Sequence, residues 1–123
     1  MRVKRFTSSA GLEILAGQDD VSNEAVTFRL GQPGDYWFHV HGFSGSHVVL
    51  RAPADGDADR DSIREAAAIA AWYSRMRTGG NVGVTMCRVR DVRKPGGVKT
   101  GTVRIRNART ITVRPALPDA ADD

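Results

Sequence analysis

The order of apolar and polar residues along the chain predicts a sheet of short strands. Seven segments show either the apolar–polar alternation of a strand with one buried face or a nearly continuous apolar run. These segments are residues 3–7, 11–16, 36–40, 47–51, 82–86, 103–106 and 110–114. The intervening residues 107–109 are few enough to join the last two segments as a hairpin.

Two helices are expected between these strands. Ser22 can cap a short helix that runs to about residue 30. A longer helix, rich in alanine on the face that would pack against a sheet, is expected to begin at Asp61 or Ser62. The glycine pair at residues 79–80 is expected to end it.

The pattern shows no internal repeat and no linker, and 123 residues are typical of one domain. A chain of this length can bury about two-thirds of its unfolded surface, so it can fold without covalent cross-links. We therefore expect residues 1–117 to form a single α+β domain with a mixed or antiparallel sheet, one long alanine-rich helix and one short helix. Residues 118–123 are expected to be an acidic, disordered tail.

Composition indicates the cellular compartment in which such a domain is expected. The single cysteine, Cys87, excludes an intramolecular disulfide and suits a reducing compartment. No apolar run approaches the roughly 20 residues that span a bilayer, and the basic N-terminus lacks the apolar segment of a secretory signal. We expect a cytoplasmic protein that does not associate with membranes.

Charge is distributed unevenly along the chain. The 27 residues from Arg88 to Arg114 contain nine basic residues and only one acid, Asp91, which gives a net charge of +8. The remaining residues contain nine basic and thirteen acidic residues, a net charge of −4. Such a field favours a polyanion: nucleic acid first, and an acidic membrane or protein second. Arginines kept for solubility are the alternative, although acids normally intersperse them.

Two groups of cations in this span are suited to phosphate. In the predicted hairpin, Arg104 and Arg106 share one strand face, with their Cα atoms about 7 Å apart, close to the phosphate spacing of a nucleic-acid strand. Arg93, Lys94 and Lys99 flank a Gly-Gly turn, where backbone amides can also reach a phosphate oxygen.

The second unusual segment contains every histidine of the protein. His39, His41 and His47 lie within residues 35–49, together with Trp37. Alternation places Tyr36, Phe38 and Val40 on one face of a strand and Asp35, Trp37, His39 and His41 on the other. Because both faces carry aromatic residues, we expect a central strand with Trp37 in the core. His39 and His47 are then brought close across the loop between them.

Several kinds of chemistry fit this segment. Aromatic and imidazole rings can stack on an unpaired base, and Ser46 with nearby amides can hold a phosphate. Asp35 and the three histidines also supply ligand types suited to zinc or iron. However, the chain has no His-Glu-x-x-His motif, no second carboxylate cluster and no nucleophile beside a possible Asp35–His39 acid–base pair. We therefore assign no metal, no cofactor and no catalytic residue.

Taken in order, several motifs resemble one known family. Asp35-x-Trp37-x-His39 followed by Gly45-Ser46-His47-Val48-Val49 is similar to the central signature of the NFACT-R (NFACT RNA-binding) domain. The resemblance extends over about residues 5–115 through four further motifs. These are Phe6-x-Ser8-x-x-Gly11-x-x-Ile14-x-x-Gly17 with Asn23, Ala66-Ala67-x-x-Ala70-Ala71-x-Tyr73-Ser74-x-x-Arg77, Val92-Arg93-Lys94-Pro95-Gly96-Gly97, and Thr110-Ile111-x-Val113-x-Pro115.

The resemblance implies RNA binding, with tRNA or rRNA as the ligand, and does not imply catalysis. The best-known members are ribosome quality-control factors, NEMF and RqcH, which act on the large ribosomal subunit and carry further domains. This chain resembles instead the short, free-standing bacterial members, for which a role in RNA modification is proposed. Many members have Pro-Gly-Ser-His where this chain has Ser44-Gly45-Ser46-His47.

The sequence therefore predicts an RNA-binding domain without catalytic activity, linked to ribosome quality control or RNA modification. The expected RNA-binding residues are Asp35, Trp37, His39, Ser46, His47, Arg93, Lys94, Lys99, Arg104 and Arg106. Two alternatives remain: a small metal- or histidine-dependent enzyme acting on RNA, and a protein-interaction module whose basic face binds an acidic partner.

Overall fold

The computed structural model describes residues 2–118 as one α+β domain, which confirms the predicted fold class. The chain forms eight strands, two α-helices, one π-helix and one 3-10 turn within the described residues. In chain order the elements are β1 Val3–Thr7, β2 Glu13–Gly17, α1 Asp20–Ala25, η1 Val26–Leu30, β3 Tyr36–Val40, β4 Val48–Leu50, α2 Arg60–Trp72, β5 Val82–Arg88, η2 Val89–Asp91, β6 Val92–Arg93, β7 Arg104–Ile105 and β8 Arg109–Val113.

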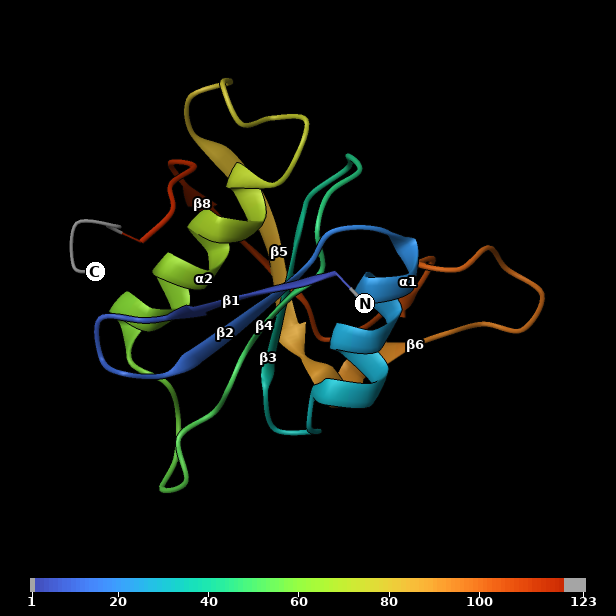
Figure 1. Ribbon diagram of the computed structural model, residues 1–123, viewed down its shortest axis with the longest axis horizontal. Helices are drawn as coiled ribbons and strands as arrows, with labels where there is room; N and C mark the ends of the chain where they lie inside the picture. Colours follow the sequence, from blue (N-terminus) through green and yellow to red (C-terminus); the bar gives the residue numbers. More distant parts are fainter. Residues whose placement is uncertain (1, 119–123) are drawn as a thin grey trace.

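Six of the strands form one antiparallel sheet in the order β1-β2-β4-β3-β5-β8. β3 lies inside the sheet between β4 and β5, so the expectation of a central strand is confirmed. Figure 1 shows α2 on one side of these strands and α1 on the other. His39 therefore lies on a strand that is hydrogen-bonded to a neighbouring strand on each side.

The two faces of the sheet carry separate cores. Tyr36, Phe38 and Val40 pack with the alanine face of α2, because small side chains let a helix approach a sheet closely. Trp37 faces the other way and packs beneath η1 with Leu15, Val26, Val49 and Cys87. Trp37 is 2% exposed, so it is the core residue that alternation predicted.

The short helix begins earlier than the sequence indicated. Its N-cap is Asp19, whose carboxylate accepts a hydrogen bond from the backbone N–H of Ser22 at 2.8 Å. The Ser22 hydroxyl in turn accepts from the Asp19 backbone N–H, which completes a capping box. Ser22 thus stabilises the first turn from inside the helix, and the prediction that it is the cap was wrong. The helix continues as the π-helix η1 to Leu30.

The long helix is shifted in the same direction. Asp59 caps it by accepting from the N–H of Ser62, and the helix ends at Trp72. The guanidinium of Arg77 folds back over the Trp72 ring at 4.6 Å and also donates to the Trp72 carbonyl. The hydroxyl of Ser74 donates to the carbonyl of Ala71. Because these contacts satisfy the last turn, the helix does not reach the glycine pair that was expected to end it.

The predicted C-terminal hairpin does not form. β7 pairs with β6 to make a separate two-stranded ladder, whereas β8 joins β5 at the edge of the main sheet. Asp91 explains the separation, because its backbone and side chain hold both Arg106 and Asn107. As a result Ile105 is 36% exposed, whereas Val113 is buried.

Within residues 2–118 no helix is long and apolar enough to cross a membrane. The tail predicted at residues 118–123 lies, apart from Pro118, outside the residues that the structure describes.

Candidate nucleic-acid interface

Three aromatic rings form the floor of the candidate site. His39 is the half-buried, next-to-last residue of β3 and His47 immediately precedes β4, so the antiparallel pairing of the two strands brings them together. The ring centroids of His39 and His47 lie 5.4 Å apart, edge to face. Trp37 stacks beside His39 at 5.9 Å and meets His47 edge-on at 5.2 Å. Trp37, His39 and His47 are called the aromatic floor below.

A buried hydroxyl links two of these rings. Thr27, on η1, is fully buried, and its Oγ1 lies 3.0 Å from Nε1 of Trp37 and 3.0 Å from Nδ1 of His47. The indole N–H can only donate, so Thr27 Oγ1 accepts from Trp37. Because Thr27 Oγ1 has no other hydrogen-bond acceptor within residues 2–118, we infer that its proton goes to Nδ1 of His47 and that the imidazole proton is on Nε2. The π-helix thereby positions His47 and favours this tautomer.

The remaining nitrogen of His47 faces the solvent. Among residues 2–118 every buried side-chain nitrogen or oxygen has a hydrogen-bond partner, and Nε2 of His47 makes no hydrogen bond there. It therefore meets the open side of the floor. His47 can offer a hydrogen-bond donor to a ligand that lies on the floor.

The imidazoles of the floor are uncharged at neutral pH. Burial, and secondarily the nearby charge of His39, lower the pKa of His47 from 6.5 to about 4. Burial also lowers the pKa of His39. The floor is thus an uncharged aromatic surface, to which His47 contributes an N–H donor, inside a domain whose net charge is +4.

The side chain of Asn23 positions the backbone of His47, and it packs directly against Gly17. Oδ1 of Asn23 accepts from the His47 backbone N–H at 2.9 Å, while the His47 carbonyl accepts from the N–H of Gly17 at 3.0 Å. A Cβ on Gly17 would lie 2.2 Å from Asn23 Oδ1. Gly17 therefore gives Asn23 the room it needs to position His47.

The loop before His47 is fixed by the end of α2. Gly45 bridges Ser74, and the Ser46 backbone N–H donates to the Tyr73 carbonyl at 3.1 Å. These contacts hold the loop without the proline that many similar sequences have at the position of Ser44. Ser46 is buried, and its small accessible surface lines a hollow together with Tyr73 and Arg75.

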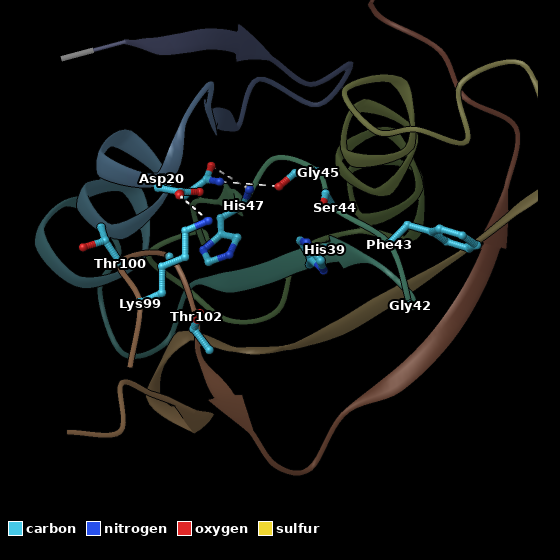
Figure 2. A pocket seen from close by; sticks show the side chains of 12 residues that line it. Asp20, His39, Gly42, Phe43, Ser44, Gly45, His47, Lys99, Thr100 and Thr102 are labelled. Atoms are coloured by element: carbon cyan, nitrogen blue, oxygen red, sulfur yellow. Dashed lines mark hydrogen bonds and ion pairs between the residues drawn. The ribbon is translucent and has the colours of Figure 1, made fainter. Parts of the chain in front are cut away.

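A cleft of about 450 Å³ opens above the aromatic floor. One wall is the loop of residues 42–45 and the other is residues 99–102, with Asp20 and Asn23 closing one end. Figure 2 shows Lys99 and Thr102 on one side of His47, and His39 with the 42–45 loop on the other. A second hollow of about 340 Å³ continues along the floor toward Ile105.

The basic loop, residues 93–102, is attached to α1 by two acids one helical turn apart. Glu24 binds Lys94 at 2.9 Å and accepts from the backbone N–H of Gly101 at 2.9 Å. These hydrogen bonds lower the pKa of Glu24. Asp20 lies 3.5 Å from Nζ of Lys99, whose side chain is 80% exposed. The acids of α1 thus position the basic loop beside the cleft.

The other predicted cations lie on the two-stranded ladder. Arg93 and Arg104 are register partners in β6 and β7 and both are exposed. Arg106 binds Asp91 at 3.2 Å. The two-stranded ladder lies next to the cleft, since Ile105 of β7 lines its second hollow.

Not every predicted site residue reaches the cleft. Asp35 is 4% exposed and accepts hydrogen bonds from the backbone N–H groups of Gln32 and Ala52 and from Arg51. It stabilises the start of β3 and lies outside the cleft lining. Arg51, which also donates to the Leu30 carbonyl, neutralises its charge.

The structure also adds residues that sequence reasoning missed. Thr27, Asn23, Asp20 and Glu24 all come from the short helical segment and all act on the floor or the basic loop. Their only signal in the sequence was the resemblance motif that included Asn23. Within residues 2–118 no three His, Cys, Asp or Glu side chains gather closely enough to hold a metal ion.

Fold and site together define a small α+β domain with a basic loop beside an uncharged aromatic cleft. A family model described as the NFACT protein RNA binding domain matches residues 2–107. The chain therefore belongs to the NFACT-R RNA-binding domain family, as its motifs indicated.

Relatives of known sequence support this membership. The chain is 36% identical over 113 residues to the Rqc2 homolog RqcH of Bacillus subtilis (strain 168), covering 92% of this chain and 19% of that protein. It is 35% identical over 114 residues to the Rqc2 homolog RqcH of Streptococcus suis (strain 05ZYH33), covering 91% of this chain and 20% of that protein. The chain thus spans about a fifth of the length of these relatives.

A solved structure shares the fold. The C-terminal of the fibronectin/fibrinogen-binding protein from Streptococcus suis superposes with a TM-score of 0.87 at 32% sequence identity. The match covers 94% of this chain and 46% of that one.

Proposed function

We propose that this domain binds structured RNA by gripping phosphates with its basic loop and two-stranded ladder, and that it catalyses no reaction. The observation that carries the proposal is the pair Arg93 and Arg104, which stand directly opposite each other in β6 and β7. Like charges in this position destabilise a strand pair. Neither arginine forms an ion pair with an acid within residues 2–118. A phosphate between them would satisfy both guanidinium groups.

Three further cations can join this grip. Lys94, Lys99 and Arg106 are bound to carboxylates, but each keeps 42% or more of its side chain exposed. Their exposed N–H groups can therefore meet a phosphate while the carboxylates stay in place. Lys99 lines the cleft, and the other four cations lie on the loop and strands that adjoin it, so their shared ligand would be a phosphate backbone.

We propose tRNA or rRNA as the ligand, and a link to ribosome quality control or RNA modification. Relatives named as Rqc2 homologs share about a third of their residues with this chain over its matched length. Co-sedimentation with purified ribosomal subunits tests the ribosomal assignment. We expect the protein to pellet with the large subunit and to remain in the supernatant with the small one.

The phosphate grip is tested by the salt dependence of binding to labelled tRNA, measured by fluorescence anisotropy. Each phosphate contact contributes about 0.7 to 0.9 to the slope of log affinity against log salt. The double variant Arg93→Ala/Arg104→Ala should lower that slope by about 1.4 to 1.8. The matched control is Lys4→Ala/Arg5→Ala on β1, which removes the same charge from an edge strand of the main sheet.

Two results would overturn the proposal. If both double variants lower the slope equally, net charge alone governs binding and the arginine pair is not a site. If the wild-type protein ignores tRNA at low salt but binds an acidic protein, the basic face is a protein-interaction surface. A DNA duplex of equal length serves as competitor, and it should displace tRNA poorly.

A further inference from the structure

The cleft above the aromatic floor differs from the rest of the basic face, because its floor is uncharged. A phosphate gains little from His39 and His47, since burial lowers the pKa of both below neutrality. The face of an uncharged aromatic ring is suited to another ring, and base stacking on aromatic side chains is a common source of affinity for single-stranded nucleic acid. The floor therefore favours the base of a nucleotide over its phosphate.

The walls of the cleft supply complementary polar groups. His47 Nε2 offers a donor at the floor, because the hydrogen bond with Thr27 occupies Nδ1. Lys99 stands at the rim with its side chain exposed, in position to meet the phosphate of a nucleotide whose base lies below it. Figure 2 shows Lys99 beside the ring of His47.

Two glycines leave the backbone of the cleft walls without covering side chains. Gly42 has a φ of 81° and Gly101 a φ of 90°, a backbone conformation that residues with a side chain rarely adopt. Each lies in one of the two loops that border the cleft. A ligand can approach the backbone of both walls at these points.

The size and position of the cleft limit the ligand further. Its volume of about 450 Å³ lies within the range of about 300–1,000 Å³ that is typical of small-ligand sites. A base inside a duplex exposes only its edges, because its faces are stacked, so a stacking floor is accessible only to a base from a loop, bulge or end.

We propose that the cleft takes one unpaired RNA nucleotide, with its base on the ring of His39 and its phosphate at Lys99. This inference rests on the proposed function, since the flanking phosphates would be held by the arginine pair. The domain would thus recognise a stem through its backbone and one extruded base through the cleft.

The test changes the RNA rather than the protein. The ligand is an RNA hairpin with a single bulged nucleotide, and the comparison ligands are the same hairpin with an abasic bulge and the fully paired hairpin. We expect the base to raise affinity about 5- to 150-fold over the abasic bulge, the usual range for one stacked base. A 2-aminopurine at the bulge should change its fluorescence on binding.

Protein variants provide the second arm. His39→Ala should remove most of the preference for the bulged base while leaving the salt slope unchanged, because the imidazole carries no charge at neutral pH. The matched control is His41→Ala, which removes an exposed imidazole that directly follows the same strand and lies outside the lining of the 450 Å³ cleft. Near-ultraviolet circular dichroism establishes that each variant is folded.

The outcomes separate this inference from the proposed function. Salt-dependent binding that is equal for the bulged, abasic and paired hairpins overturns the nucleotide cleft and leaves the phosphate grip intact. Absence of binding to all three RNAs overturns both. Saturable binding of free nucleoside monophosphates without RNA binding would assign the cleft to a free nucleotide and also overturn the inference.

Discussion

The hydroxyl of Thr27 is predicted to be a major contributor to the stability of the aromatic floor. Replacing Thr27 by valine preserves the shape of the side chain but removes the only group that binds both Trp37 and His47 in the described structure. Thr27 is fully buried, Trp37 is 2% exposed and His47 is 4% exposed, so water cannot easily replace the lost partner.

The magnitude follows from the two groups that lose their partner. An unsatisfied buried donor or acceptor costs about 1–3 kcal/mol, so Thr27→Val should lower the free energy of unfolding by about 2–6 kcal/mol. That is a large share of the roughly 5–15 kcal/mol by which domains are stable. Urea unfolding followed by circular dichroism measures the change.

The control is Thr27→Ser, which keeps the hydroxyl and loses one methyl group, at a cost of about 1 kcal/mol. The reasoning is refuted if the valine variant is as stable as the serine variant. Nitrogen chemical shifts of the imidazole give an independent check. In the wild-type protein His47 should carry its proton on Nε2. In Thr27→Val this preference for one tautomer should be lost.

Three further predictions concern the same face of the sheet. Because the pKa of His47 is about 4 in the folded state and about 6.5 when unfolded, the unfolded state binds more protons between these values. The free energy of unfolding should therefore fall by about 3 kcal/mol as the pH drops from 6.5 to 4, measured by urea unfolding. Gly17→Ala should cost about 1–3 kcal/mol, since the new Cβ would lie 2.8 Å or less from three atoms of Asn23. Cys87 should resist alkylation in the native protein and react in urea, because burial raises its pKa to about 12.

Each of these has a result that contradicts it. A flat stability profile between pH 4 and 6.5 would mean that His47 is accessible to protons in the folded state. The control for the glycine is Gly34→Ala, whose Cβ would meet nothing within 4 Å; equal costs for the two variants would exclude steric crowding as the cause. Equal alkylation rates in buffer and in urea would place the thiol at the surface.

Local pattern predicted most of the elements. The alternation over residues 36–40 identified both faces of the central strand, and the alanine spacing identified the helix that packs on one of them. These signals are reliable because the side chains of one face recur with a fixed period in any strand or helix. Helix ends were less well predicted, since Asp19 and Asp59 compete with nearby Ser22 and Ser62 as caps and only the folded chain selects between them.

The candidate site was predicted only in part. His39 and His47 were expected to meet, and they do, because the strands that carry them are consecutive and short loops join neighbouring strands. Asp35 follows the same alternation, but Arg51 and two backbone amides engage it away from the cleft. Thr27 carries no sequence signal, because its role depends on a contact between a π-helix and a strand ten residues away.

The sequence by itself determined the α+β class, the two-faced central strand, the family, and the concentration of positive charge near the C-terminus. The tertiary structure decided how that charge is used. A two-residue strand can pair with any neighbour of suitable register, and Asp91 directed β7 to β6 instead of β8. That pairing, with the attachment of the basic loop to α1, places the arginine pair and Lys99 beside the cleft. Such long-range pairings depend on the geometry of the whole chain, which local periodicity does not encode.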